Sequence, residues 1–231
     1  MTNCMLVRRE VAAPNAPAAV LLALHGHGGG VDQLEPLCRV LHSDLSLVLP
    51  QAWRTLHVHG MYEAEDPGHS WFFNFADGSP EPATYGDCLM ELENLVYDIR
   101  EHHSPKVPII VVGIDQGAVL ALGLCGVVPD YLAGVAAIGG HVPKIKGWAP
   151  PYEDFMGLPS LLIRDAAATQ GSDAIIQREM QDCNADVTLC RVGGVLKSPL
   201  LAAAPLRQWI GPLLRAPTSA ALMRDCAAVE D

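Results

Sequence analysis

A turn framed by two glycines near the middle of the chain constrains the fold more than any other feature. Residues 107–112 read VPIIVV, residues 113–117 read GIDQG, and residues 118–124 read AVLALGL. The short apolar run predicts a buried strand, and the apolar stretch after the turn predicts a helix. The pattern therefore predicts a strand, a sharp turn and a helix in direct succession.

Short apolar runs alternate with helical patterns along the rest of the chain. Strands are predicted at residues 18–24, 45–49, 132–138, 159–163 and 187–192, with an antiparallel strand at 5–11 on the edge of the sheet. Helices are predicted at residues 31–41, 81–103, 172–182 and 201–214. This alternation is typical of the α/β class, in which helices on both faces flank a mainly parallel central sheet.

Length and composition favour a single domain. The chain has 231 residues, of which 50% are hydrophobic, and this is enough for one sizeable core. We expect the domain to span residues 1–215. Residues 216–231 show no pattern that would pack against it and are predicted to be a C-terminal tail.

The charge pattern limits the partners that the chain can bind. A formal net charge of −11 and the lack of a dense Lys/Arg cluster argue against nucleic acid and anionic membranes. No apolar run has the length of a membrane span, the first residues do not resemble a signal peptide, and the seven cysteines follow no disulfide or zinc spacing. We expect a cytoplasmic protein that acts on a small molecule without a metal or other cofactor. Its oligomeric state stays open, with a homodimer as one alternative.

Residues 113–117 have the G-x-S-x-G frame of a nucleophile elbow, with Asp115 in place of the serine. Three further segments accompany it: residues 24–29 (LHGHGG), residues 47–52 (LVLPQA) and residues 71–72 (WF). On these motifs the chain resembles the small α/β-hydrolases that include carboxylesterases, lysophospholipases and acyl-protein thioesterases. The resemblance spans nearly the whole chain and implies the α/β-hydrolase fold.

The resemblance does not extend to the catalytic triad. The family's serine corresponds to Asp115, its acid to Ala168, and its histidine to Lys197, or to Leu196 if the loop is shifted by one residue. A serine triad needs a nucleophile, a base that takes its proton and an acid that orients the base. Since all three side chains differ here, ordinary ester hydrolysis is the least favoured enzymatic activity.

The family's oxyanion hole consists of backbone amides, which in this chain would be those of Gln116 and His27. Amides that point at a developing negative charge lower a reaction barrier whatever their side chains are. The resemblance therefore implies that this part of the site persists. Gly28 and the glycines beside it would also let the loop backbone approach a ligand closely.

Asp115 has several roles open to it in this setting. It could act as a general base beside the oxyanion hole, or as a nucleophile that forms an ester with the substrate. Alternatively, its carboxylate could occupy its own oxyanion hole, or pair with Lys197 or Arg164, and block the site. Three histidines on loops that border the expected pocket are candidates for the missing base: His27, His69 and His141.

Two long connections, residues 50–80 and 139–158, are expected to form the walls of the pocket. Both are rich in aromatic residues, among them Trp71 and Phe72 in the first. These aromatics predict either a substrate pocket or a buried cluster beneath a loop. No ligand spacing in the sequence supports a metal site.

These observations lead to one favoured function and two alternatives. The favoured one is an atypical enzyme for a small, partly apolar oxygenated molecule, with a non-hydrolytic reaction such as elimination, isomerisation or cyclisation. The alternatives are a catalytically inactive protein that binds a small ligand or partner, and residual esterase, thioesterase or epoxide-hydrolase-like activity. The predicted catalytic residues are Asp115, His27, Gln116 and His141, and the predicted substrate-binding residues are His69, Trp71, Phe72 and Gly28.

Overall fold

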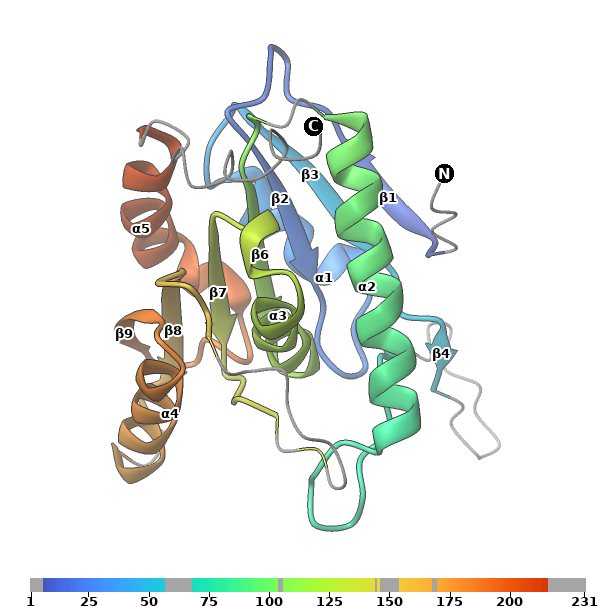
Figure 1. Cartoon of the computed structure of the whole chain (residues 1–231), viewed down its shortest axis with the longest axis vertical. Coiled ribbons are helices and arrows are strands. Elements are labelled where there is room, and N and C mark those ends of the chain that lie inside the picture. Colours follow the sequence, from blue (N-terminus) through green and yellow to red (C-terminus); the bar gives the residue numbers. More distant parts are fainter. Residues whose placement is uncertain are drawn as a thin grey trace, which may run out of the picture.

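The computed structural model describes residues 6–56, 68–103, 106–143, 145, 154–167 and 170–215. Its centre is a seven-stranded sheet in the order β1-β3-β2-β6-β7-β8-β9 (Figure 1). These strands are β1 (Arg8–Val11), β2 (Ala19–Leu24), β3 (Leu45–Pro50), β6 (Ile109–Ile114), β7 (Gly134–Ile138), β8 (Pro159–Asp165) and β9 (Asp186–Val192). β1 pairs antiparallel with β3, and the other neighbours in the sheet run parallel. A separate antiparallel pair is formed by β4 (Arg54–Thr55) and β5 (His69–Ser70).

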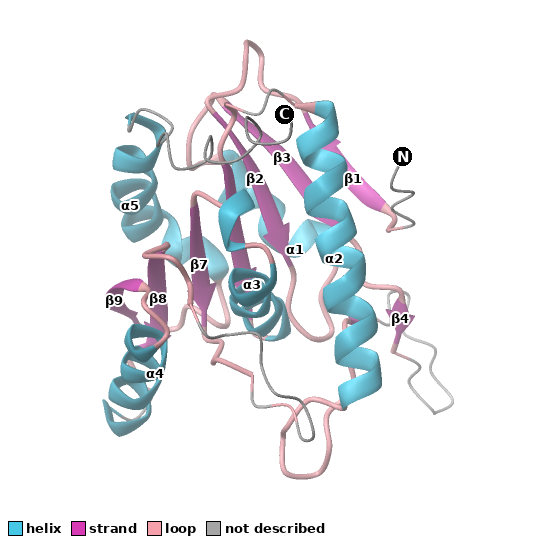
Figure 2. Ribbon diagram, viewed as in Figure 1, coloured by secondary structure: helices cyan, strands magenta, loops and turns pink. Residues whose placement is uncertain are grey.

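Helices cover both faces of the sheet (Figure 2). The α-helices are α1 (Val31–Arg39), α2 (Pro82–His102), α3 (Gln116–Val127), α4 (Gln170–Asp182) and α5 (Ala203–Arg215), and the 3-10 helices are η1 (Pro129–Tyr131) and η2 (Pro199–Ala202). Buried residues of α2 and α3 share a hydrophobic cluster on one face, and those of α1 and α5 share a cluster on the other. The sheet is therefore the middle of three layers.

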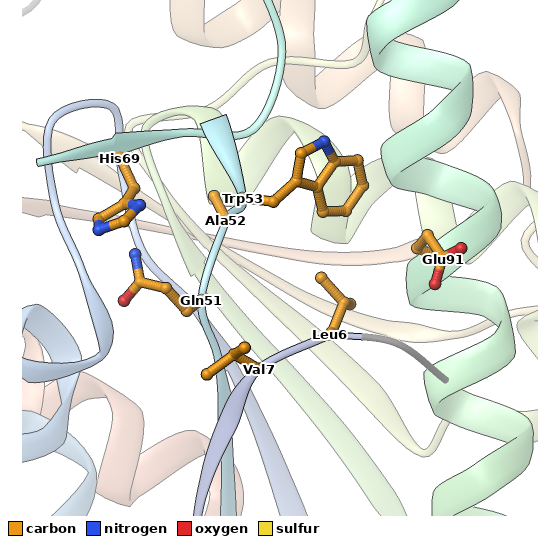
Figure 3. A pocket seen from close by; sticks show the side chains of 7 residues that line it. All are labelled: Leu6, Val7, Gln51, Ala52, Trp53, His69 and Glu91. Atoms are coloured by element: carbon orange, nitrogen blue, oxygen red, sulfur yellow. The ribbon is translucent and has the colours of Figure 1, made fainter. Parts of the chain in front are cut away.

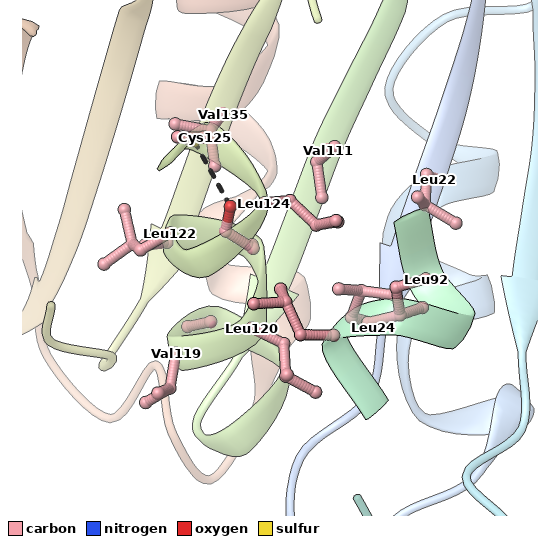
Figure 4. Close-up of a cluster of buried hydrophobic side chains, with 14 of the residues drawn as sticks. Leu22, Leu24, Leu92, Val111, Val119, Leu120, Leu122, Leu124, Cys125 and Val135 are labelled. Carbon is pink, nitrogen blue, oxygen red and sulfur yellow. Dashed lines mark hydrogen bonds between the residues drawn. The ribbon is translucent and has the colours of Figure 1, made fainter. Parts of the chain in front are cut away.

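Strand β2 illustrates why the central strands are apolar at every position. All of its residues are buried. Leu22 belongs to the cluster with α2 and α3, whereas Leu21 belongs to the cluster with α1 and α5. Because successive side chains of a strand point to opposite faces, a strand covered on both sides has no solvent-facing position. Figure 4 shows Leu22 in the first cluster, together with Val111 of β6, Leu92 of α2 and Leu120 of α3.

The predicted α/β class and the predicted order of strands and helices are confirmed. The edge strand expected to run antiparallel is β1, which pairs with β3. The strand expected from residue 132 begins at Gly134, because η1 occupies the residues before it. Residues 216–231, the predicted tail, lie outside the described residues. Within the described ranges, no helix combines the length and the apolar character that crossing a membrane requires.

Gly113 and Gly117 allow β6, β2 and the start of α3 to approach one another. A Cβ atom on Gly113 would overlap the backbone of Gly117, and a Cβ atom on Gly117 would overlap the carbonyl oxygens of Leu24 and His25. Only glycine leaves room for these backbone contacts. The glycine frame thus places the residue between them, Asp115, at the carboxyl end of the central strands.

Candidate functional site

Asp115 lies at the junction of β6 and α3 in a strained backbone conformation. Its φ is 52° and its ψ is −116°, values that non-glycine residues rarely adopt. The turn is held by hydrogen bonds from the Asp115 amide to the Ile138 carbonyl (2.9 Å) and from the Ala118 amide to the Asp115 carbonyl (3.0 Å). The conformation exposes the carboxylate at the surface, as the sharp turn in the sequence predicts.

The Asp115 carboxylate occupies part of the predicted oxyanion hole. Its Oδ2 atom accepts a hydrogen bond from the backbone amide of His27 at 2.9 Å. Gly26 makes this approach possible, since a Cβ atom there would lie 3.1 Å from the Asp115 Cβ atom. This contact is the arrangement that the sequence left open as an alternative, in which the carboxylate occupies its own oxyanion hole. The stabilisation of a substrate oxyanion by the His27 amide stays a prediction.

Neither of the predicted ion-pair partners contacts Asp115. The Arg164 Nε atom donates to Asp173 Oδ1 at 2.9 Å, and its Nη1 atom donates to the Gly140 carbonyl at 2.6 Å. Lys197 instead lies near Asp165, a carboxylate at the end of β8. The pairings of Asp115 with Arg164 and Lys197 are thus wrong, since both cations interact with other carboxylates.

Asp165 is a polar residue of this region whose role the sequence did not reveal. The backbone amide of Ala167 lowers the pKa of Asp165, with further contributions from the amides of Gly194 and Leu196 and from the charge of Lys197. The Asp165 carboxylate therefore lies beside the loop after β9, where the family's histidine would lie. Its position at the carboxyl end of a parallel strand was the available signal. Ala168, the expected counterpart of the family's acid, lies outside the described residues.

The side chain of Gln116 forms hydrogen bonds that connect the end of β5 and the segment after it to the elbow. It is 4% exposed, its Oε1 atom accepts from Ser70 Oγ (3.0 Å) and from the Trp71 amide (3.1 Å), and its Nε2 atom donates to the Phe72 carbonyl (2.8 Å). Gln116 was predicted for its backbone amide alone. The structure assigns its side chain a structural role, because a buried amide with three good hydrogen bonds fixes its neighbours.

Trp71 and Phe72 belong to the hydrophobic core. Trp71 is 0% and Phe72 2% exposed, and the Trp71 indole donates to the His25 carbonyl at 2.8 Å. Phe72 packs edge-on against Tyr85 of α2. The structure therefore corrects the prediction that both rings contact a substrate. They form the buried cluster that was the alternative, because large aromatic side chains seal a loop onto a helix when their faces are covered.

His25, which was not a candidate, is the most perturbed histidine of the site. It is 1% exposed and stacks on Trp71 with ring centroids 4.8 Å apart. Its Nδ1 atom lies 2.8 Å from the Gly26 carbonyl, and its Nε2 atom accepts from the Ala52 amide at 3.0 Å. Burial lowers the pKa of His25 to about 4. A neutral imidazole with both nitrogens engaged is a structural residue, which connects the ends of β2 and β3.

The three predicted candidate bases lie in three different surroundings. The His27 ring is exposed, with Nδ1 3.2 Å from Ser70 Oγ. His141 lines a cavity of about 420 Å³ with Pro80 and Ile176, and His69 lines a second cavity of about 600 Å³. Among the described histidines, none has a ring nitrogen within hydrogen-bond distance of the Asp115 carboxylate. The structure therefore does not bring a candidate base to Asp115.

Gly28 and Gly29, in the loop after β2, form backbone hydrogen bonds with His69 of β5. Its φ is +72°, and its amide donates to the His69 carbonyl at 2.9 Å, while the His69 amide donates back to the Gly29 carbonyl at 3.0 Å. The predicted contact of Gly28 with a substrate stays a prediction. No group of three or more His, Cys, Asp or Glu residues in the described part of the chain is arranged to hold a metal ion.

Comparisons with known proteins agree on the fold. No protein-family model matches the chain. The carboxylesterase of Mesorhizobium loti has a TM-score of 0.75 at 21% identity, covering 91% of this chain and 97% of its own. That of Bacillus cereus has a TM-score of 0.71 at 18% identity (90% and 96% covered), and Zea mays acyl-protein thioesterase 2 has 0.66 at 14% (90% and 99% covered). These similarities show that the chain has the α/β-hydrolase fold.

One curated protein is similar in sequence. NocK of Nocardia uniformis subsp. tsuyamanensis, whose name describes it provisionally as an esterase, is 29% identical over 153 residues. The matched region makes up 62% of this chain and 38% of NocK.

Proposed function

We propose that this chain is an α/β-hydrolase-fold protein that binds a small molecule without hydrolysing it. The observation that carries the proposal is the 2.9 Å hydrogen bond from the His27 amide to the Asp115 carboxylate. Hydrolysis of an ester builds negative charge on the substrate oxygen, and that oxygen needs this amide. Here a fixed anion already receives the hydrogen bond and would repel a second negative charge beside it.

The loop after β9 supports the same proposal. An acyl-transfer enzyme of this fold needs a base close to its nucleophile. In this chain the loop carries Lys197, which lies near Asp165 and not near Asp115. The fold therefore retains the elbow and its glycines, while the groups that would activate a nucleophile and receive an oxyanion are engaged elsewhere.

A second candidate function is proton abstraction by Asp115. One observation favours it: Oδ2 is held by the His27 amide, whereas Oδ1 of the exposed carboxylate has no partner among the described residues. An oriented carboxylate with one unpaired oxygen can remove a proton from a carbon acid or a hydroxyl. The strained φ of 52° at Asp115 is consistent with a catalytic role, since strained backbone conformations are concentrated at functional sites.

One set of variants separates these functions. The wild-type protein, Asp115→Asn, Asp115→Ala and the control Asp130→Asn, an exposed position in η1, are assayed on p-nitrophenyl acetate and on a panel of lactones, epoxides and enolisable ketones. For a binding protein we expect no turnover that depends on the carboxylate. Asp115→Ala should hydrolyse p-nitrophenyl acetate faster than the wild type, because the amide of His27 becomes available.

The contrary results are equally definite. Ester hydrolysis by the wild type that Asp115→Asn abolishes would show that the proposed function is wrong. Turnover of a non-ester substrate that falls at least about 100-fold in Asp115→Asn, with an unchanged melting temperature, would establish proton abstraction instead, since general-base catalysis contributes roughly 100- to 10,000-fold.

A further inference from the structure

The imidazole of His27 is exposed, but it contacts a buried hydrogen-bond network. Its Nδ1 atom lies 3.2 Å from Ser70 Oγ, and Ser70 is 0% exposed. Figure 3 shows the side chain of His69, which precedes Ser70 in β5, beside a cavity of about 600 Å³. Because successive side chains of a strand point to opposite sides, Ser70 points away from that cavity. It lies instead against His27 and Gln116 of the elbow.

The Ser70 hydroxyl also contacts two oxygen atoms. Its Oγ atom lies 2.9 Å from the Phe72 carbonyl oxygen and 3.0 Å from Gln116 Oε1. The orientation of the Gln116 amide is determined on both sides, because Oε1 accepts from the Trp71 amide at 3.1 Å and Nε2 donates to the Phe72 carbonyl at 2.8 Å. A flipped side chain would turn its NH2 group toward an N–H donor and its oxygen toward a carbonyl oxygen. Both oxygens beside Ser70 are therefore acceptors.

The single hydroxyl proton of Ser70 determines the tautomer of His27. A hydroxyl donates one hydrogen bond and has two acceptor sites. If Ser70 donated to His27 Nδ1, its oxygen would face two acceptor oxygens with no proton between them, which is unfavourable in a buried network. If Ser70 donates to one of those oxygens, it can accept a hydrogen bond from His27. The neutral imidazole therefore carries its proton on Nδ1, and its Nε2 atom is an acceptor.

Two side-chain atoms at the elbow have no hydrogen-bond partner among the described residues, and both are acceptors. They are His27 Nε2 and Asp115 Oδ1. The two residues are exposed and adjacent, since the His27 amide donates to Asp115 Oδ2 at 2.9 Å. A molecule that binds these atoms must present a hydrogen-bond donor, whereas the carbonyl oxygen of an ester is an acceptor.

We propose that Ser70 is a positioning residue that holds His27 in the Nδ1–H tautomer, and that His27 Nε2 accepts a hydrogen bond from an O–H or N–H group of the bound molecule. The proposal gives the ligand chemistry of the proposed binding function and rests on that function. The tautomer is measured on the free protein, so it can fail while the binding function stands. Ester hydrolysis that depends on Asp115 would refute the binding function and leave the tautomer unchanged.

Nitrogen NMR of the isotope-labelled full chain measures the tautomer directly. The spectrum is recorded at about pH 8.5, where ordinary histidine side chains are neutral. We expect the Nδ1 resonance of His27 at the position of a protonated ring nitrogen and its Nε2 resonance at that of an unprotonated one. Both signals are assigned by their loss in His27→Phe, which keeps the backbone amide that binds Asp115.

Two serine variants separate the positioning role from a structural one. Ser70→Ala removes the acceptor of the Nδ1 proton, so the Nε2–H tautomer of His27 should appear in its spectrum. Ser160→Ala in β8 is the matched control, because Ser160 is also 0% exposed and donates to the Leu158 carbonyl at 2.9 Å. Both variants lose a buried hydroxyl, but only Ser70→Ala should change the tautomer.

Phenol and anisole test the ligand chemistry, since phenol donates a hydrogen bond and its methyl ether does not. Phenol should shift the His27 Nε2 resonance and the backbone amide resonances of residues 26–28. The dissociation constant from these shifts should be at least about threefold lower for phenol than for anisole. His27→Phe should weaken phenol binding by a similar factor, and the exposed control His42→Phe should not. Phenol in the cavity of Figure 3 would instead shift the resonances of Ala52 and Trp53.

Four results would overturn the proposal. The first two concern the tautomer: an unprotonated Nδ1 in wild-type His27, and the same tautomer in Ser70→Ala as in the wild type. The other two concern the ligand: no shift at residues 26–28 with phenol up to about 20 mM, and equal affinities of the elbow for phenol and anisole. A lower melting temperature of Ser70→Ala with an unchanged tautomer would show that Ser70 has a structural role only.

Discussion

The buried histidine beneath the elbow makes the protein's stability depend on pH in a defined range. His25 is neutral in the folded protein, because its Nε2 atom accepts the Ala52 amide and desolvation opposes a positive charge. Burial lowers the pKa of His25 from an ordinary 6.5 to about 4. An unfolded chain regains the ordinary pKa, so it takes up a proton that the folded state does not.

The size of the effect follows from this shift. As the pH falls from about 6.5 to about 4, the unfolded state becomes protonated at His25 and the folded state stays neutral, so the free energy of unfolding decreases. A shift from 6.5 to about 4, at about 1.36 kcal/mol per pKa unit, corresponds to a loss of about 3 kcal/mol. Above the unfolded pKa the full stability is present.

The assay compares the wild type with His25→Gln by urea unfolding at several pH values between 7.5 and 4. A glutamine can accept the hydrogen bond from Ala52 but does not titrate. The variant should be the less stable protein at pH 7.5, since it loses the stacking on Trp71. The difference should shrink by up to about 3 kcal/mol toward pH 4.

The control is His42→Gln, whose side chain is 44% exposed, and its difference from the wild type should change much less over the same range. A gap between the wild type and His25→Gln that stays constant from pH 7.5 to 4 would refute the reasoning. It would mean that His25 titrates alike in the folded and unfolded states.

Two further substitutions test the packing around the site. Gly117→Ala should lower the free energy of unfolding by about 1–3 kcal/mol, because its Cβ would overlap the backbone of β2. Gly211→Ala in α5 should change it by less than about 1 kcal/mol, because the gain in helix propensity is opposed by the following Pro212; equal effects in urea unfolding would contradict the role of Gly117. Asp173→Asn should cost about 3 kcal/mol in the same measurement, since the carboxylate is 2% exposed and pairs with Arg164 and Arg191; a loss under about 1 kcal/mol would argue against this pairing as a source of stability.

The strands and helices were predictable because a segment that packs in the core has apolar residues at regular spacing in the sequence. The run at 109–114 and the helix at 82–102 appear where apolar spacing places them. The elbow was predictable for a related reason, since two glycines around one polar residue meet a steric need that no other residue meets. Such features depend on neighbours close in the chain.

The aromatic residues show where this reasoning stops. Trp71 and Phe72 suited a pocket wall and a core equally well, because a large apolar ring is used in both places. The contacts that decide between pocket wall and core come from Gln116, His25 and Tyr85. Each of these residues lies 14 or more positions from Trp71 in the sequence, and only the fold brings them next to Trp71 and Phe72. Sequence spacing carries no record of such contacts.

The sequence alone determined the α/β architecture, the sharp turn at Asp115 and the loss of the serine at that turn. Only the tertiary structure decided that the Asp115 carboxylate accepts a hydrogen bond from the His27 amide and that Arg164 pairs with Asp173. The reason is physical. The backbone conformation and the burial of a segment depend on residues that are close together in the sequence. Hydrogen bonds and ion pairs between distant segments depend on where the folded backbone brings their atoms together.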